Sequence, residues 1–250
     1  IALCRRPQGR VELFALMVMD ILEALHALGE PVPAAAAATL LARIRAWQKF
    51  MERGRDGVLS AEEELGLAGE LSMLTALLDA GLPADRALDA WLGPLDGLQD
   101  FSLGKGAIEV KATVASAGFP AWISELSQLD DGLVHPIFVA AVRMGLSETG
   151  KTLPELVGAV RQRIANTPAE AMVFEARLLH ANYDDRWIDG YVRRFVPAGT
   201  RLIRVDQAFP RLTPATVPGA VRRARYEIEL DQVSSEAVEL REALIELGVI

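Results

Sequence analysis

Cysteine is almost absent from this chain of 250 residues, in which Cys4 is the only one. A single thiol cannot form a disulfide framework, so the sequence favours a protein of a reducing compartment. No signal-peptide pattern is found at the start of the sequence. The longest apolar candidate, residues 11–28, is interrupted by charged side chains and predicts an amphipathic helix instead of a membrane span. We therefore expect a cytoplasmic protein.

Histidine is also scarce, and His26, His135 and His180 are far apart in the sequence. None of them lies in a zinc-binding spacing such as H-E-x-x-H, and no serine occupies a G-x-S-x-G motif. These absences argue against a zinc enzyme and against a serine hydrolase.

Positive charge is in deficit, since 26 Lys and Arg against 34 Asp and Glu give a formal net charge of -8. This balance argues against a protein that holds nucleic acid mainly through a broad positive surface. The dense basic clusters are Arg193-Arg194 and Arg222 to Arg225, and we interpret both as solvated edges of strands or helices. The four tryptophans are dispersed and are interpreted as packing residues. Any contact with nucleic acid is expected to be local or shared with a partner.

Hydrophobic periodicity predicts an α/β chain with a helical N-terminal portion, residues 1–58, packed on a core domain of residues 59–250. Capping-box spacing marks three helix starts, at Ser60 with Glu63, Thr152 with Glu155 and Thr167 with Glu170. The expected helices cover residues 11–28, 34–51, 60–80, 153–165, 168–182 and 235–247, with a short helix ending near Trp91. The expected strands cover residues 98–103, 107–113, 121–126, 137–144, 191–196, 201–208 and 222–230.

The first two expected strands are joined by Gly104-Lys105. If these residues form a two-residue turn, Leu103 pairs with Gly106 and Asp100 faces Glu109. Directly opposed carboxylates in antiparallel strands are close enough to share one hard cation. Strand alternation then places Lys111 on the same face as Glu109. A three-residue turn would instead send Asp100 to the opposite face.

Glu70 lies on the same helical face as the apolar stripe of Leu67, Leu71, Leu74 and Leu78. A carboxylate on a face that points to the core is strongly disfavoured unless it is paired or metal-bound. Two explanations remain open at this point. Glu70 either shares a cation with Asp100 and Glu109 or meets an arginine such as Arg86.

Asp100 followed by Glu109-Val110-Lys111 resembles the active-site signature of the PD-(D/E)XK nuclease superfamily. Gln99 stands where that signature has proline, and the eight-residue gap is short for the superfamily. Together with other segments, the signature resembles the bacterial PD-(D/E)XK motif protein family, which is associated with restriction and phage-defence gene clusters. The similarity covers most of the chain, and the other segments are Gly66 to Leu71, Trp91 to Pro94, Lys151 to Val157 and Ala208 to Pro210.

This resemblance implies a restriction-endonuclease-like mixed β-sheet flanked by helices, and hydrolysis of DNA phosphodiesters with Mg²⁺ or Mn²⁺. It implies that Asp100, Glu109 and Lys111 are catalytic, and that Glu70, Asp100, Glu109 and the Val110 carbonyl bind metal. Ser127 and Gln128 are candidate residues for contact with nucleic acid. Partner subunits of a restriction or defence system are expected, and a homodimer stays an open alternative.

A second motif competes with this hypothesis. Gly145 to Thr152 matches the P-loop pattern G-x4-G-K-T, between an expected strand and an expected helix. Pro154 would remove a backbone donor close to the phosphate-binding turn. No convincing apolar strand ending in a magnesium-binding aspartate accompanies the motif. A P-loop nucleotidase is therefore a less favoured alternative, beside a non-catalytic scaffold subunit with a nuclease fold.

Overall fold

The computed structural model describes residue 4 and residues 11–26, 36–37, 39–41, 43–44, 47, 58–95 and 97–250. Most of the helix expected over residues 34–51 lies outside these ranges or in their gaps. The helices described are α1 (Val11–His26), α3 (Ala61–Asp79), α4 (Ala84–Ala90), α5 (Leu153–Arg163), α6 (Pro168–His180) and α7 (Leu240–Glu246), with 3-10 turns η1 (Gly93–Leu95), η2 (Asp185–Gly190) and η3 (Leu230–Gln232). The strands are β1 (Phe101–Leu103), β2 (Gly106–Thr113), β3 (Pro120–Ile123), β4 (Ile137–Lys151), β5 (Phe195–Arg204), β6 (Tyr226–Glu229) and β7 (Ala237–Val238).

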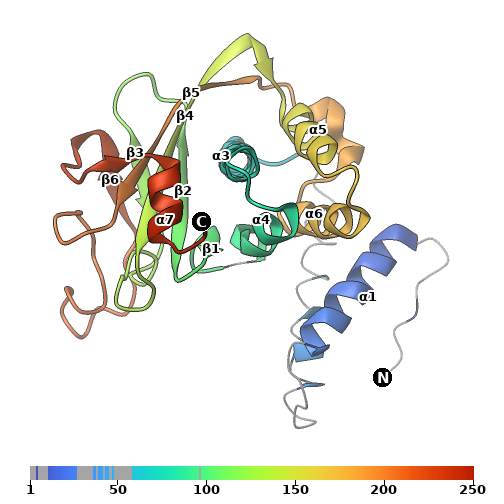
Figure 1. Ribbon diagram of the computed structural model, residues 1–250, viewed down its shortest axis with the longest axis horizontal. Helices are drawn as coiled ribbons and strands as arrows, with labels where there is room; N and C mark the ends of the chain where they lie inside the picture. The colour runs from blue at the N-terminus through green and yellow to red at the C-terminus, as the bar shows by residue number, and fades with distance from the viewer. Residues whose placement is uncertain are drawn as a thin grey trace.

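A five-stranded mixed sheet forms the centre of the fold, with strand order β1-β2-β4-β5-β7. β2 is antiparallel to β1 and parallel to β4, whereas β4–β5 and β5–β7 are antiparallel. The parallel pair needs a crossover connection, and β3 lies within it, where it pairs with β6 in a separate two-stranded sheet. In Figure 1, α3, α4, α5 and α6 lie on one side of the large sheet, and β3 and β6 lie on the other.

The two faces of the large sheet enter two separate apolar cores. On the face toward α3, Ile108 and Val110 of β2 belong to the same buried cluster as Leu71 of that helix. On the opposite face, Val139 of β4 belongs to a smaller cluster with Ile123 of β3 and with residues of β6. Because side chains alternate along a strand, β2 must present its remaining residues to this second face.

Helix α3 begins and ends at the expected residues. The Ser60 hydroxyl accepts the Glu63 N–H at 3.2 Å, and the Glu63 carboxylate accepts the Ser60 N–H at 2.9 Å. After the helix, Gly81 takes a φ of +91°, a conformation that favours glycine. Within the helix, a β-carbon on Gly69 would lie 2.8 Å from the Ala112 β-carbon of β2. Glycine therefore allows α3 to pack closely on β2, with the next residue, Glu70, beside that strand.

Several predicted elements differ from those observed. The strands expected over residues 191–196 and 201–208 are one strand, β5, because the ladder with β4 continues past Pro197 and Gly199 through a register shift. The helix expected over residues 235–247 is divided into β7 and α7. The third capping box is absent, since the Thr167 hydroxyl donates to the Ile164 carbonyl at 2.9 Å instead of capping α6.

The P-loop prediction is wrong. Residues 145–151 belong to strand β4, and a β-carbon on Gly150 would lie 2.8 Å from the backbone of Arg194 and Phe195. The Gly150 carbonyl accepts a hydrogen bond from the Arg194 guanidinium at 2.8 Å. Thr152 caps helix α5 in a capping box with Glu155. The motif is therefore a strand followed by a helix cap, and its backbone does not form a phosphate cradle.

Among the helices in the described ranges, none combines the length and the apolar character that crossing a membrane requires.

Candidate metal-dependent active site

The β1–β2 hairpin has the register that a two-residue turn predicts. Leu103 pairs with Gly106 and Phe101 pairs with Ile108, while Gly104 takes a φ of +56°. One further step along this register brings Asp100 opposite Glu109. The geometry that the metal-site hypothesis required is therefore present in the backbone.

Asp100 turns onto the edge of β2 where the ladder with β1 has ended. Its Oδ2 accepts the Val110 N–H at 2.7 Å. The N–H and the carbonyl of one strand residue point to the same side of the strand, so the Val110 carbonyl faces this edge as well. Both groups predicted as metal ligands here, the Asp100 carboxylate and the Val110 carbonyl, are thus on one edge.

Glu109 and Lys111 project from the face of β2 that points away from α3. The Lys111 Nζ lies 2.7 Å from Glu109 Oε1, and the Gln128 side-chain amide donates to the same oxygen at 2.7 Å. Glu109 is only 2% exposed, and its Oε2 is buried without a hydrogen-bond partner in the described part of the chain. A buried carboxylate oxygen without a partner is costly, and a bound cation would remove that cost.

Glu70 reaches the site from α3 and is held by Trp91. The indole N–H of Trp91 donates to Glu70 Oε2 at 2.6 Å. Trp91 is fully buried, tilts against Phe174 at a centroid distance of 5.9 Å, and forms a β-bridge with Phe101. The interpretation of every tryptophan as a packing residue is therefore incomplete, because this indole also orients a carboxylate.

The alternative partner expected for Glu70 is not observed. The Arg86 guanidinium instead donates to the Val249 carbonyl at 3.5 Å. Arg86 is therefore not the partner of Glu70, which lies near Asp100 instead. A cation shared by these carboxylates stays a prediction.

Glu70 and Asp100 converge at Gly93. A β-carbon on Gly93 would lie 2.5 Å from Glu70 Oε2 and 2.8 Å from Asp100 Oδ1, so any larger residue would displace both carboxylates. The N–H groups of Leu92 and Gly93 donate to the Asp100 carbonyl at 2.7 and 3.0 Å. The Trp-Leu-Gly-Pro segment thus contributes the indole donor of Trp91 and a glycine that leaves room for two carboxylates. It also contributes two backbone N–H groups that hydrogen-bond to the Asp100 carbonyl.

Three carboxylates share one ammonium group at this site; Glu109 is buried, and Glu70 and Asp100 are half-buried. Burial, followed by the charge of Asp100, raises the pKa of Glu70 to about 8 and the pKa of Glu109 to about 8. Burial also raises the pKa of Asp100, and the Val110 N–H and the Lys111 charge oppose that rise. Raised pKa values in a cluster of this kind mean that the ionised carboxylates repel one another unless a cation joins them.

The donor set fits a hard divalent cation. Each carboxylate has one oxygen held by a protein donor, namely the Trp91 indole, the Val110 N–H, or the Gln128 amide together with Lys111. Oxygen ligands of this type suit Mg²⁺ or Mn²⁺. Within the described ranges, no three His, Cys, Asp or Glu side chains stand at the spacing of a preformed metal centre. In the observed arrangement Lys111 neutralises Glu109, so binding a cation would require a local side-chain adjustment.

Gln128 is linked to the site through Glu109, and Ser127 is not. The Ser124 N–H donates to Gln128 Oε1 at 3.0 Å, which turns the amide nitrogen of Gln128 toward Glu109. Gln99 donates to the Gln128 carbonyl at 3.0 Å and so anchors the same loop. Ser127 is half-buried, and its carbonyl accepts the Asp130 N–H. The predicted contact of this pair with nucleic acid stays a prediction.

The mixed sheet, its flanking helices and the carboxylates beside its hairpin define a protein with the PD-(D/E)XK nuclease-like fold. The family model described as "Putative PD-(D/E)XK family member, (DUF4420)" matches residues 1–231, and the chain therefore belongs to this family. No curated protein and no solved structure matches the chain. Family membership confirms the expected fold class and a relation to nuclease-type enzymes, which generally use divalent metals.

Proposed function

We propose that this protein is a metal-dependent endodeoxyribonuclease of a restriction or phage-defence system. The observation that supports this proposal most directly is the meeting of Glu70 and Asp100 at Gly93, next to a buried Glu109 with one unpartnered oxygen. Glu70, Asp100, Glu109 and the Val110 carbonyl would bind one or two Mg²⁺ or Mn²⁺ ions. When bound, such an ion polarises the phosphate and lowers the pKa of its water.

The protein's own residues contribute orientation and proton handling. Lys111, on the same face as Glu109, is placed to donate a hydrogen bond to the attacking water or to the phosphate oxygen that gains charge. The Val110 N–H fixes Asp100, and Gln128 fixes Glu109, so that each carboxylate keeps its second oxygen available. In the hydrolysis, the water oxygen would form a new P–O bond and give up one proton to solvent, while the P–O bond to one sugar breaks and the departing sugar oxygen takes up a proton.

Partner subunits are part of the proposal. A chain with a net charge of -8 has an overall field that repels DNA, so recognition of a sequence or of a modification is assigned to other subunits. A homodimer would place two active sites for cleavage of both strands, and its presence would be seen as a doubled mass in solution.

A plasmid-nicking assay with Mg²⁺ or Mn²⁺ tests this function. Lys111→Ala should lower the cleavage rate by about 10²-fold or more, the usual effect of removing a group that stabilises charge at the reacting centre. Lys105→Ala is the matched control, because Lys105 is an exposed lysine in the turn of the same hairpin. Equal activity in Lys111→Ala and the wild type would contradict the proposal. A wild type that fails to nick DNA both with Mg²⁺ and with Mn²⁺ would favour the non-catalytic scaffold.

A further inference from the structure

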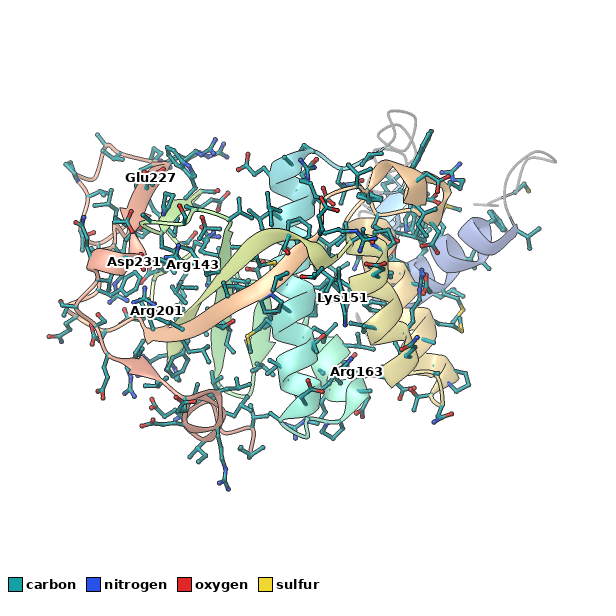
Figure 2. All side chains as sticks on the ribbon, turned by 90° about the horizontal axis from the view of Figure 1, so that it is seen from above. Arg143, Lys151, Arg163, Arg201, Glu227 and Asp231 are labelled. Atoms are coloured by element: carbon teal, nitrogen blue, oxygen red, sulfur yellow. The ribbon has the colours of Figure 1, made fainter. Side chains whose placement is uncertain are left out.

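The two basic clusters of the sequence have different environments in the structure. Arg193 and Arg194 lie 2.5 and 3.1 Å from the carboxylates of Glu64 and Glu155. Many other arginines are neutralised in the same way. Arg143 and Arg201 both lie close to Asp231 (Figure 2), at distances of 2.8 and 3.0 Å from its carboxylate.

In the part of the chain that the structure describes, the second cluster has no such partners. Its three arginines are exposed, and within the described ranges none of them forms an ion pair: these are Arg222, Arg223 and Arg225. In a protein with a net charge of -8, three neighbouring arginines without carboxylate partners are a local exception. The interpretation of both clusters as solvated edges therefore does not treat two different cases separately: the first cluster is paired with carboxylates, and the second is not paired among the described residues.

Trp122 stands beside this second cluster. Ala121 and Ile123 of β3 enter the smaller core, so Trp122 faces outward, where 45% of it is exposed. The Arg225 guanidinium lies 4.6 Å from the centre of its ring. An exposed indole with an arginine stacked on it is a flat surface with positive charge, and such surfaces stack nucleic-acid bases in proteins that bind single strands. We name Trp122, Arg222, Arg223 and Arg225 together the Trp122 platform.

The Trp122 platform adjoins the proposed active site along β3. Ser124 is two residues beyond Trp122, which is about 7 Å along a strand. The Ser124 N–H donates to Gln128, and Gln128 donates to Glu109. The chain that carries the exposed indole therefore leads directly to a group that orients a proposed metal ligand.

We infer that the Trp122 platform binds unpaired nucleotides of a DNA strand next to the proposed active site. The indole and the Arg225 guanidinium stack on a base, and Arg222 and Arg223 contact the flanking phosphates. This inference rests on the proposed nuclease function for its biological setting, whereas the binding itself does not require cleavage. Stacking of this kind needs a base whose face is free, so we expect single-stranded DNA to bind better than duplex DNA.

One acidic residue borders the platform and provides an internal test. Glu227 is exposed and lies directly opposite Trp122 in the β3–β6 pair, on the side of the molecule away from Lys151 and Arg163 (Figure 2). Its negative charge repels a phosphate backbone. Glu227→Gln should therefore strengthen DNA binding, in the direction opposite to the arginine variants.

The test is fluorescence anisotropy of a labelled single-stranded oligonucleotide with the full chain in EDTA, so that no cleavage occurs. Trp122→Leu should weaken binding by about fivefold or more, as expected when one base no longer stacks. Replacing Arg222 and Arg223 by glutamine should lower the slope of log affinity against log salt by about 0.7 for each phosphate that no longer has an arginine partner. Arg241→Gln is the charge-matched control for Arg225→Gln, because Arg241 is an exposed arginine on α7.

Two results would overturn the inference. One is wild-type affinity in both Trp122→Leu and Arg225→Gln. The other is an equal loss of affinity in Arg241→Gln, which would show that only net charge matters. Because binding is measured without metal, a wild type that binds single strands but does not nick plasmids would refute the nuclease proposal alone. A wild type that nicks plasmids while the platform variants bind normally would refute the platform alone.

Discussion

Glu64 and Glu70 are both carboxylates of α3 that point inward, but their surroundings differ. Glu64 is 1% exposed, and the Arg193 guanidinium lies 2.5 Å from its Oε2. Among the described residues, Glu70 accepts a hydrogen bond from the neutral indole N–H of Trp91 and faces the carboxylate of Asp100. The first carboxylate has an opposite charge as partner, and the second has like charges as neighbours.

This difference separates a carboxylate that serves the fold from one that serves a site. A buried ion pair is close to balanced, and its removal leaves an uncompensated charge. A group of buried and half-buried carboxylates with a single ammonium is unbalanced in the folded protein, and such an arrangement is typical of positions that bind a cation. Four experiments test this distinction between Glu64 and the group around Glu70.

The largest effect is expected from Glu70→Gln. Loss of a metal-ligand charge should lower the nicking rate by about 10²-fold, while the metal-free protein should be no less stable because a repulsion has been removed.

Glu64→Gln should lower the stability of the protein but not the nicking rate. It should cost about 1 to 3 kcal/mol of unfolding free energy in urea, reduced because Arg193 is 36% exposed, and leave the rate of the folded enzyme unchanged. A similar fall in the nicking rate in Glu70→Gln and Glu64→Gln would show that the two carboxylates do not have different roles.

Gly93→Ala should have the next largest effect. The added β-carbon would stand where Glu70 Oε2 and Asp100 Oδ1 now lie, so Mn²⁺ affinity measured by calorimetry should fall by about tenfold or more. Gly66→Ala on α3 is the control, since its β-carbon would meet nothing within 4 Å. That change should leave metal binding unaltered and stabilise the helix by about 0.5 to 1 kcal/mol. Normal Mn²⁺ binding by Gly93→Ala would show that the two carboxylates do not act together.

Trp91→Phe should have a smaller effect on the same measurement. Phenylalanine keeps an aromatic ring but has no N–H to hold Glu70, and removal of a residue that orients a ligand lowers metal affinity by about 10-fold or somewhat more. Trp187→Phe provides the comparison, because Trp187 is 36% exposed on η2. If both variants bind Mn²⁺ like the wild type, the hydrogen bond from Trp91 has no role in orienting Glu70.

The smallest effect concerns pH and metal. The pKa values of Glu70 and Glu109 in the folded protein are raised to about 8, from the ordinary glutamate value of 4.5. Between these two pH values, both side chains keep a proton in the folded protein but lose it in the unfolded chain. This stabilising contribution is present below pH 4.5 and is lost as pH rises toward 8. In EDTA, the melting temperature should therefore fall between pH 5 and pH 8, and Glu109→Gln should flatten the decline. At pH 8, a divalent cation at ten times its Kd should restore about 1.4 kcal/mol. A metal-free melting temperature that rises over this pH range would contradict the raised pKa values.

The sequence was sufficient to predict the central geometry of the candidate site. A glycine at the first turn position indicated the two-residue hairpin, and the hairpin set Asp100 opposite Glu109. Strand alternation then placed Lys111 beside Glu109, and helical periodicity placed Glu70 on the inner face of α3. These predictions succeeded because each depends on local backbone geometry.

Contacts between distant segments could not be predicted in this way. Trp91 is 21 positions from Glu70, and the Gln128 amide is 19 positions from Glu109, so both hydrogen bonds depend on tertiary packing. In the sequence Gln99 is only a departure from the proline of the signature, whereas in the structure its amide anchors the Gln128 loop. Gly93 lies next to two carboxylates in the structure. The one indication of its importance in the sequence was its place in the Trp-Leu-Gly-Pro segment, which resembles the family.

The brevity of β1 has a consequence for how this site could change. β1 has three residues, and its ladder with β2 stops at Ile108, which leaves the Val110 N–H available to Asp100. If a regular strand extended two pairs further, the Gln99 carbonyl would accept the Val110 N–H, and the Asp100 side chain would lose its anchor. The candidate active site therefore depends on a strand that ends early, and insertions that lengthen the hairpin ladder would remove the anchor of Asp100.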